Sequence, residues 1–557
     1  MSFNDAQKGL IRKLALLNAV KHGGKANPGA IVGGVLGDFP SLKQVMKELM
    51  IEINSVVKDV NSLSLEKQKE ELDNIAPGVL ERKHEVNLFG FLNIKEGEKI
   101  RTAFPPGPEK YPHIGHAKAL LMNFLLAKQY NGEFYLRFED TNPDLVKKEF
   151  YQIMQDDFKW LGVKWDKLIF ASDYMDLYYK HCEDLLRKGL AYVCTSSQED
   201  IRKMRETGES LPERDSLPED NLALWKAMAK MEKGKAVVLL KIDLKHKNST
   251  MRDPIIFRII DSEHARHGFK YRVWPNYDFQ NAIMDGYFKI THRLRSKEFE
   301  MRNELQRYIQ MLLGYKETKI YEFARFNLQG VESSGRIIRD KIANGELLGW
   351  DDPSLTTLAA LRRRGFQPEA IKDFVVKTGI TKSESTLTWD DLIMHNKRFL
   401  DEKVDRYFFV ADPKLLKIKG APKLEFELNL HPSKRRGGRK FVTAENFFVS
   451  ANDLKSLKKG SIYRLIECLN FKYNGSGKGL FVDTAVNTFR EKGVSMLHFL
   501  PENDFVEGSV LMSDKSIVKG YFEKGVLNLK EGDCVQFERF GFCRLDNKKE
   551  LSFWFSH

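Results

Sequence analysis

The sequence predicts a multidomain protein in which an α/β domain is joined to helical regions and to a C-terminal region of β-strands. Its 557 residues exceed what one hydrophobic core usually organises, because domains typically take about 100–200 residues. A strand, a turn, a helix and a second strand follow one another after residue 98, and short alternating strands dominate from about residue 399. This order of strands and helices predicts an α/β part and a β-rich part within one chain.

Residues 1–97 are predicted to form a helical unit. An apolar stripe at helical spacing ends at the glycine pair Gly23-Gly24; its members are Leu10, Ile11, Leu14, Leu17 and Val20. A second amphipathic stretch runs from about Pro40 to Val60. Between the two stretches, Lys21 and Lys25 flank the glycines, which is typical of a basic helix C-terminus.

The α/β domain is predicted in two halves, residues 98–171 and residues 277–325, separated by an insertion. The first half begins with a strand through Thr102, continues in a helix after His113 and returns in a strand over 134–138. The insertion, residues 172–276, contains helical segments and a strand at 236–242. A helical region at 326–398 follows, and the strands of 399–557 are expected to form β-barrels.

The turn before the predicted helix carries two histidines, His113 and His116, one helical turn apart. A helix N-terminus offers unpaired N–H groups and a partial positive charge, so this position suits an anion such as a nucleotide phosphate. Two surface histidines at an ordinary helix start are the alternative. The Pro/Gly-rich turn and the preceding strand favour the phosphate site.

Several segments resemble class I aminoacyl-tRNA synthetases, and more narrowly the archaeal and eukaryotic form of glutamyl-tRNA synthetases in the glutamyl and glutaminyl branch. FPPGPEKYPHIGHAKA is similar to the HIGH signature, and RFEDTNP at Arg137–Pro143 to the segment that follows it. The further similar segments are YRVWPNYDF, THRLRSKEF, GWDDPSLTTLAALRRRG and VQFERFGFCRLD, at 271–279, 291–299, 349–365 and 535–546. Their shared order makes the resemblance specific.

The resemblance implies a Rossmann-like catalytic domain whose insertion grips the tRNA acceptor stem, and C-terminal barrels that bind the anticodon. It also implies glutamate–tRNA ligase activity: ATP-dependent formation of glutamyl-adenylate, then transfer to the terminal adenosine of tRNA(Glu). Mg²⁺ would accompany ATP as a co-substrate, and no tightly bound metal is predicted. Whether tRNA(Gln) is also charged stays open, and no oligomeric state is predicted.

The resemblance also implies residue roles. His113, His116 and Arg336 would be catalytic, because this chemistry depends on positioning and on stabilising phosphate charge. ATP would be bound by Pro106, Gly107, His113, Gly115, His116, Ser333, Ser334 and Arg336. Glutamate would be bound by Arg101, Glu139, Tyr277 and Arg295, with Asp140 as the alternative to Glu139 for the α-ammonium group.

Arg295 indicates the amino acid. A guanidinium pairs bidentately with a carboxylate, whereas a carboxamide offers it no charge. Glutaminyl relatives have a small uncharged residue here, so Arg295 points to glutamate, although an arginine in a surface salt bridge is the alternative.

Two positions depart from the family pattern. Ala103 stands where relatives have an arginine, and Arg101 could replace it, because both lie on one face of a strand. Gly107 also lacks a polar side chain. In the loop that corresponds to the KMSKS signature, Gly335 stands where a lysine is expected, which would leave the cationic role to Arg336.

Three alternatives follow. A glutamine-specific ligase on the same scaffold is disfavoured by Arg295. A non-catalytic tRNA-binding paralogue is motivated by Ala103 and Gly335. A small nucleotidyltransferase would not need the long basic C-terminus.

The net charge of +13 favours a polyanionic partner, although charge alone does not separate RNA from DNA or from an anionic membrane. The candidate tRNA contacts are Lys21, Lys25, Arg363, Arg364, Arg435, Arg436 and Arg439. The alternative is a basic helix C-terminus for the two lysines and a solvated charged face for the arginines.

The five cysteines show no zinc-ligand spacing, which predicts free thiols in a reducing compartment. No signal peptide or apolar run of about 20 residues is recognised, so we expect a soluble cytoplasmic protein without membrane contacts.

Overall fold

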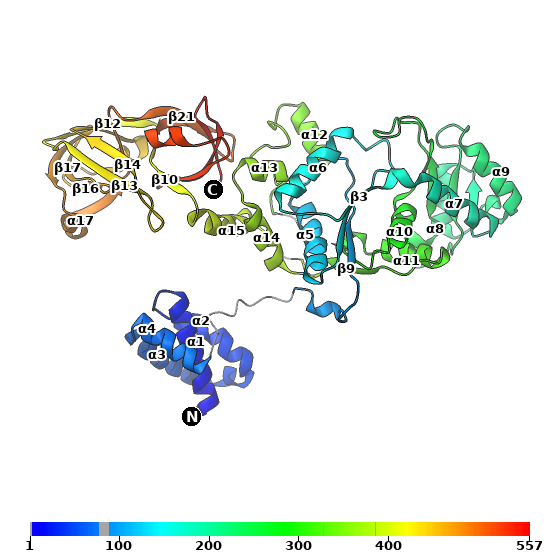
Figure 1. Ribbon diagram of the computed structural model, residues 1–557, viewed down its shortest axis with the longest axis horizontal. Helices are drawn as coiled ribbons and strands as arrows, with labels where there is room; N and C mark the ends of the chain where they lie inside the picture. Colours follow the sequence, from blue (N-terminus) through cyan, green and yellow to red (C-terminus); the bar gives the residue numbers. More distant parts are fainter. Residues whose placement is uncertain (1–2, 77–87, 327, 333, 385) are drawn as a thin grey trace. The chain divides into compact units, whose positions relative to one another are not determined.

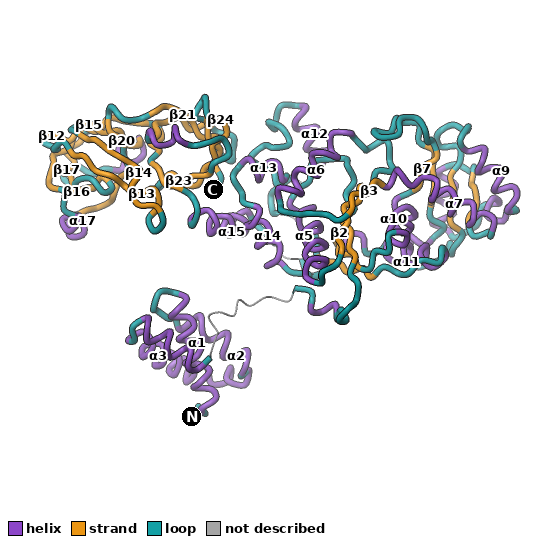
Figure 2. Tube along the Cα trace, viewed as in Figure 1, coloured by secondary structure: helices purple, strands orange, loops and turns teal. Residues whose placement is uncertain are grey.

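The computed structural model describes residues 3–76, 88–326, 328–332, 334–384 and 386–557. The chain divides into two compact units, Met1–Asn93 and Ile94–His557. Helices make up most of the first unit, whereas the second combines helices with sheets (Figures 1 and 2). The mixed α/β and β-rich fold class expected from the sequence is confirmed.

The first unit is a bundle of four α-helices: α1 (Asp5–Lys21), α2 (Pro28–Asp38), α3 (Met46–Ser62) and α4 (Leu65–Ile75). Asn4 caps α1 in a reciprocal pair of hydrogen bonds with Gln7. The bundle core contains Ile11, Leu16, Ile31, Ile53 and Leu72. The buried amide of Gln68 donates to the Gly24 carbonyl at 3.0 Å, which fixes the turn after α1.

A five-stranded parallel sheet begins the second unit. Its strand order is β3-β2-β1-β8-β9, formed by β1 (Arg101–Phe104), β2 (Glu133–Phe138), β3 (Lys167–Phe170), β8 (His292–Ser296) and β9 (Lys319–Phe323). The order reverses between β1 and β8, where ligands bind in open parallel sheets. The helices of this domain are α5 (Ile114–Gln129), α6 (Lys148–Trp160), α10 (Tyr277–Tyr287) and α11 (Arg302–Leu312).

The two faces of the sheet are covered by different helices. On one face Asn123 of α5 joins β1 to β8, because its backbone carbonyl accepts from Thr102 Oγ1 and its amide side chain bonds the backbone of Leu294. On the other face α10 approaches β8, and Asn281 of α10 accepts a hydrogen bond from Arg293. This arrangement places the carboxyl ends of β1 and β8 between the two helices.

The residues between β3 and α10 form a second, antiparallel sheet of four strands. Its strands are β4 (Ala191–Cys194), β5 (Val237–Leu240), β6 (Ile255–Ile259) and β7 (Val273–Pro275), and its helices are α7 (Met175–Arg187), α8 (Gln198–Thr207) and α9 (Pro218–Met228). The strand expected at 236–242 is therefore shorter than predicted. One apolar core, which includes Met175, Trp274 and Phe279, runs from this sheet to α10.

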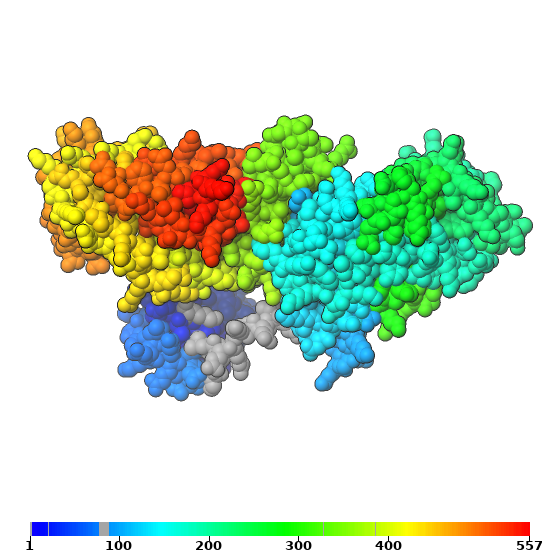
Figure 3. All heavy atoms as spheres, turned by 45° about the horizontal axis from the view of Figure 1, so that its top comes forward, coloured from blue at the N-terminus to red at the C-terminus, as the bar shows by residue number. Residues whose placement is uncertain are grey.

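Four helices follow the parallel sheet: α12 (Gly335–Ala343), α13 (Leu358–Arg363), α14 (Pro368–Thr378) and α15 (Trp389–Asp401). Arg363 of α13 donates to both carboxylate oxygens of Asp546, at 2.9 and 2.7 Å. Arg364 donates to the carbonyl of Ser556 at 2.6 Å. These bonds join the helices to the C-terminal strands, and Figure 3 shows the yellow-green helical segment next to the red C-terminal residues.

The C-terminal region contains two seven-stranded sheets and a hairpin. The first sheet has the order β10-β23-β24-β25-β21-β22-β11 and the second the order β19-β16-β17-β18-β12-β15-β20. Their strands are β10 (Asp405–Tyr407), β11 (Phe409–Ala411), β12 (Pro413–Lys419), β15 (Asn446–Ser450), β16 (Ile462–Leu465), β17 (Asn470–Gly475), β18 (Lys478–Asp483), β19 (Gly493–Leu497), β20 (Leu500–Pro501), β21 (Val506–Leu511), β22 (Ile517–Phe522), β23 (Cys534–Phe537), β24 (Gly541–Asn547) and β25 (Ser552–Phe555). The hairpin consists of β13 (Leu424–His431) and β14 (Arg435–Thr443), and two short helices are α16 (Ala451–Ser456) and α17 (Val486–Lys492). Each seven-stranded sheet has its own aromatic core.

The cysteines are free thiols: Cys182, Cys194, Cys468 and Cys543 are buried, and Cys534 is partly exposed. No helix within the described ranges combines the length and the apolar character needed to cross a bilayer.

Candidate active site

A cavity of about 750 Å³ lies where the strand order of the parallel sheet reverses. The turn between β1 and α5 forms one wall, and the start of α10 with the end of β8 forms another. The sequence-predicted residues that line it are Pro106, Gly107, His113, Gly115, His116, Glu139, Tyr277 and Arg295. The fold thus brings together residues that are up to about two hundred positions apart in the chain.

His113 and His116 form a fixed pair at the start of α5. The Nδ1 atom of His113 accepts a hydrogen bond from the Gly115 backbone N–H at 3.1 Å, and the Nδ1 atom of His116 accepts from the His113 backbone N–H at 3.2 Å. A neutral imidazole whose Nδ1 accepts carries its proton on Nε2. Each ring therefore has an Nε2–H donor left for a ligand in the cavity.

The two imidazoles are neutral at physiological pH. Burial lowers the pKa of His113 to about 3, and the positive charges of Lys110 and Arg325 lower it further. Burial also lowers the pKa of His116 well below its usual value. Their contribution to phosphate binding is therefore hydrogen-bond donation rather than positive charge.

Gly115 is required for this arrangement. A Cβ atom at this position would lie 2.9 Å from Cε1 of His113 and 3.2 Å from the carbonyl oxygen of Phe326. Any side chain at Gly115 would therefore displace the ring that caps α5.

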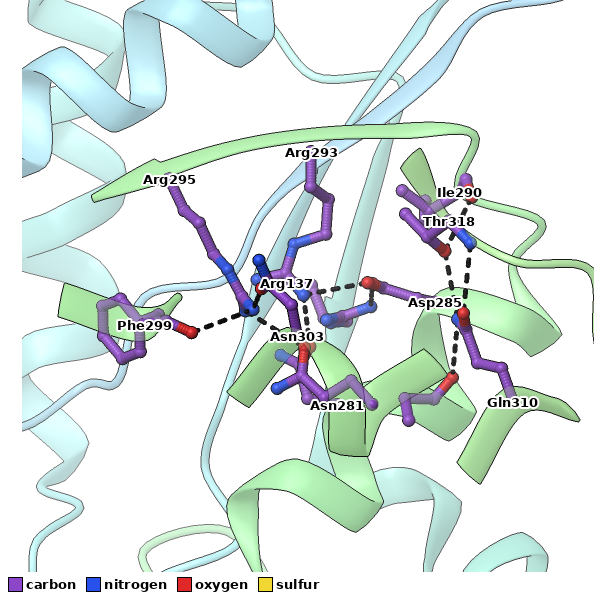
Figure 4. Close-up of polar contacts among 12 residues, drawn as sticks. Arg137, Asn281, Asp285, Ile290, Arg293, Arg295, Phe299, Asn303, Gln310 and Thr318 are labelled. Carbon is purple, nitrogen blue, oxygen red and sulfur yellow. Dashed lines mark hydrogen bonds and ion pairs between the residues drawn. The ribbon is translucent and has the colours of Figure 1, made fainter. Parts of the chain in front are cut away.

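Arg137 of β2 lies near two arginines of β8, Arg293 and Arg295, which line the opposite side of the cavity (Figure 4). Arg137 of β2 and Arg293 of β8 bind the two carboxylate oxygens of Asp285, at 2.7 and 2.8 Å. Figure 4 shows Arg293 and Arg295 on one side of β8, as expected for residues two positions apart in a strand. Asp285 thereby neutralises part of the charge of the first two arginines.

Arg295 is a buried cation without an acidic partner. Its guanidinium donates to Gln306 Oε1 at 3.0 Å, and also to Asn303 Oδ1, both of which are uncharged. Within the described part of the chain, no carboxylate lies within ion-pair distance of Arg295, and its Nε atom is buried without a hydrogen-bond partner. Burial lowers its pKa to about 10, so it remains charged at neutral pH.

Glu139 faces the cavity, whereas Asp140 does not. Arg137 Nε donates to Glu139 Oε1 at 2.8 Å, and the second oxygen, Oε2, is buried without a partner. Burial raises the pKa of Glu139, and the charge of Arg137 opposes that shift. Asp140 instead accepts from Tyr151 and Ser172, inside the protein. Of the two acidic residues, only Glu139 is available to a ligand.

Arg101 lies outside the cavity lining. Its Nε atom donates to Glu133 at 2.6 Å and its Nη1 atom to the Phe288 carbonyl at 2.9 Å. Arg101 begins β1, and the cavity forms beyond the opposite end of that strand. The expectation that Arg101 replaces the family arginine at Ala103 is therefore wrong in its geometry.

The structure places Gly335 and Arg336 in the first turn of α12 rather than in a loop before it. Arg336 is exposed and, like Ser334, is absent from the cavity lining. Ser334 instead caps α12 through its hydroxyl. Ser333 lies outside the described residues.

The candidate tRNA contacts divide by burial. Lys25 and Arg436 are exposed, and Lys21 is helical with a side chain that the structure does not describe. Arg435 is bonded to Asp405, and Arg363 to Asp351 and Asp546. Arg364 and Arg439 are 4% and 3% exposed, so the expectation that they contact phosphates is wrong. The basic clusters in the sequence do not reveal which of their arginines are buried.

Sequence reasoning missed Arg293, Lys110 and Arg325, all of which line the cavity. Arg293 precedes Arg295 by two positions, so strand periodicity could have placed both on one face. Nothing in the local pattern around Lys110 or Arg325 distinguishes them from surface cations.

The chain matches known families over most of its second unit. Residues 99–402 match tRNA synthetases class I (E and Q), catalytic domain, and residues 404–482 and 495–546 match two anti-codon binding domains of the same synthetases. The chain is 41% identical over 550 residues to the glutamate--tRNA ligase of Pyrococcus abyssi, with 96% of each chain covered.

Two further relatives are also glutamate--tRNA ligases by name. The glutamate--tRNA ligase of Methanothermobacter thermautotrophicus is 37% identical over 552 residues, with 98% of this chain and 99% of that protein covered. The glutamate--tRNA ligase of Nitrosopumilus maritimus is 37% identical over 563 residues, with 98% of each covered. Since these matches extend over nearly the full length and include the cavity, the chain belongs to the class I tRNA synthetases of the E and Q group.

Proposed function

We propose that the cavity between α5 and α10 is where this chain, a glutamate–tRNA ligase, activates glutamate with ATP. An oxygen of the glutamate α-carboxylate attacks the α-phosphorus of ATP, and the bond from that phosphorus to the pyrophosphate oxygen breaks. The terminal 2′-hydroxyl of tRNA then attacks the carbonyl carbon of glutamyl-adenylate and releases AMP. The observation that carries the assignment is the buried, unpaired charge of Arg295.

Arg295 receives the side-chain carboxylate of glutamate. A buried cation without a counter-ion is costly, and an incoming carboxylate supplies both the charge and the hydrogen-bond acceptors that Arg295 lacks. A carboxamide would supply only one acceptor and no charge. Because the side chains that bond Arg295, those of Gln306 and Asn303, are uncharged, the site favours glutamate over glutamine.

Glu139 receives the α-ammonium group of glutamate, and Tyr277 borders the same space. The unpartnered oxygen of Glu139 is the only acceptor that this side chain still has available, because Arg137 holds the other. An acid at one end and a cation at the other fit an amino acid whose two ends carry opposite charges.

His113 and His116 donate their Nε2 protons to the phosphates of ATP. Their neutral state avoids the loss of activity that a titrating imidazolium would cause near pH 6.5. The small residues Pro106, Gly107 and Gly115 leave room for a nucleotide to approach the backbone at the start of α5. Mg²⁺ enters bound to ATP, as a co-substrate.

The other parts of the chain bind tRNA(Glu). In this proposal residues 98–171 and 277–325 form the catalytic domain, residues 172–276 hold the acceptor stem, and residues 326–398 connect it to the anticodon-binding residues 399–557. Support comes from the family matches, which assign anticodon binding to regions within 404–546. Residues 1–97 add the exposed Lys25 as a further candidate contact.

The direct test is aminoacylation of purified tRNA(Glu) and tRNA(Gln) with labelled glutamate or labelled glutamine. We expect glutamate to be attached to tRNA(Glu), and the tRNA(Gln) arm decides whether that tRNA is also a substrate. Stable binding of tRNA without attachment of glutamate would instead support a non-catalytic tRNA-binding paralogue.

A further inference from the structure

The first turn of α12 brings no cationic side chain into the cavity, although Arg325, earlier in the connection from β9, does line it. Gly335 has no side chain, and Arg336 is exposed and does not line the cavity. A reaction that concentrates negative charge on a triphosphate needs positive groups near the phosphates, and the neutral His113 and His116 provide hydrogen bonds only.

Lys110 lies in the turn between β1 and α5, three positions before His113. It lines the large cavity together with His113 and His116. It also lines a small adjoining cavity whose other walls include Gly335, Tyr111 and Trp350. The side chain therefore extends from the histidine pair to the first residue of α12.

The stem of Lys110 occupies the place of a side chain at Gly335. A Cβ atom at Gly335 would lie 2.9 Å from Cδ and 3.5 Å from Cβ of Lys110. The backbone of Gly335 does not have a positive φ, so its conformation does not require glycine. A larger residue at Gly335 would instead push the stem of Lys110 aside.

The ammonium group of Lys110 is available to an anion. In the described part of the chain it makes neither a hydrogen bond nor an ion pair, although Glu109 and Glu298 contribute charge at longer range. Burial lowers its pKa, as expected for a lysine that stands in a cavity wall without a counter-ion. Its positive charge also adds to the effect of burial in lowering the pKa of both histidines, which places it near them.

We propose that Lys110 is the cation that binds the ATP phosphates in the transition state, in place of a basic residue at Gly335 or Arg336. The inference rests on the proposed function. It adds a catalytic residue to the turn that already carries His113, so the phosphate-binding groups come from one rigid strand-to-helix connection rather than from a separate loop.

The test is glutamate-dependent ATP–pyrophosphate exchange in the presence of tRNA, with kcat and KM measured for ATP and for glutamate. Lys110→Ala is expected to lower kcat about 10²- to 10³-fold, the usual loss for one preorganised charge donor. The KM for glutamate should stay within about twofold. Lys110→Arg keeps the charge and should retain more than a tenth of the wild-type kcat. Lys128→Ala, at the exposed far end of α5, is the matched control and should behave as wild type.

A reciprocal exchange separates charge from packing. Gly335→Lys alone should lower activity, because the new side chain meets Lys110. Lys110→Gly combined with Gly335→Lys should recover at least tenfold of the kcat lost in Lys110→Gly, because the charge returns to the same space from the other side.

Two results would overturn the proposal. One is a Lys110→Ala protein with wild-type kcat, above all if Arg336→Ala is inactive. The other is a loss in Lys110→Ala that neither Lys110→Arg nor the reciprocal exchange restores, because the lysine would then act only by packing on Gly335. Failure of the proposed function looks different: the unmodified protein would show no glutamate-dependent exchange at all.

Discussion

Ala103 of β1 and Arg293 of β8 lie side by side on one face of the parallel sheet. The register pairs the residues immediately before them, Thr102 and His292. Ala103 is 1% exposed and Arg293 is 2% exposed, and only the latter reaches the cavity. Relatives have an arginine at the position of Ala103. In this chain Arg293 places a positive charge on the neighbouring strand instead, on the face that also carries Arg295.

Replacement of Arg293 by lysine is expected to weaken glutamate binding. The Nη1 atom of Arg293 bonds both Asp285 and Asn281, which leaves other guanidinium N–H groups for a ligand. Lysine has one nitrogen for all these contacts, so the charge would shift within the cavity. Loss of one charge-assisted hydrogen bond, about 1.5–3 kcal/mol, corresponds to a rise of roughly ten- to hundredfold in the KM for glutamate. Arg101→Lys is the matched control, since Arg101 lies outside the cavity, and an equal effect in both variants would contradict this account.

Acid should destabilise the protein in part through His113. Its folded pKa, about 3, lies below the usual value near 6.5, so the unfolded chain takes up the proton first as the pH falls. The contribution of His113 to the free energy of unfolding is therefore fully present above pH 6.5 and is lost between pH 6.5 and about 3. The loss at pH 5 is at most about 2 kcal/mol for this one group, less where solvent in the cavity screens it.

The substitution His113→Asn tests this pH dependence. An asparagine can accept from the Gly115 N–H and keep the cap of α5, but it does not titrate. Thermal unfolding at pH 7 and pH 5 should show a smaller acid shift in His113→Asn than in the unmodified protein. An unchanged acid shift would mean that His113 does not contribute.

Replacement of Arg439 by alanine should lower stability, whereas replacement of Arg436 should not. Arg439 is bonded to the buried Glu523 at 2.9 Å and to Glu538 at 2.6 Å, so Arg439→Ala leaves a buried carboxylate unpaired and should cost about 3–5 kcal/mol of stability. Arg436 is exposed on the hairpin, and Arg436→Ala should leave thermal unfolding unchanged. If Arg436 contacts a phosphate, its loss should reduce the salt dependence of tRNA binding by about one counter-ion, measured as the slope of log affinity against log salt. An Arg439→Ala protein of unchanged stability would contradict the structural role.

The sequence predicts the core of the site well where the signal is local. Short stretches of sequence predict the strand that ends at Phe104, the Pro/Gly turn and the helix after His113. The three-residue spacing of His113 and His116 predicts that the two histidines lie together at the start of that helix. Arg295 stands out in the sequence because glutaminyl relatives have a small uncharged residue at this position.

The errors concern residues whose role depends on a contact distant in sequence. Arg101 and Ala103 share a strand face, but Arg101 is at the end of β1 away from the cavity and meets Glu133 there. Arg364 and Arg439 resemble surface cations in the sequence, yet both are buried. Arg364 donates to the backbone carbonyl of Ser556, and Arg439 pairs with the carboxylate of Glu523. The role of Lys110 has no local signal in the sequence, because only the folded chain brings its side chain against Gly335.

The central claim is that the unpaired charge of Arg295 selects glutamate in this cavity. ATP–pyrophosphate exchange with glutamate and with glutamine, compared between the unmodified protein and Arg295→Ala, tests it most directly. The unmodified protein should use glutamate at least 10²-fold better than glutamine in kcat/KM, and Arg295→Ala should lose most of that preference through its activity with glutamate. Equal use of the two amino acids by the unmodified protein, or an undiminished preference in Arg295→Ala, would contradict the claim.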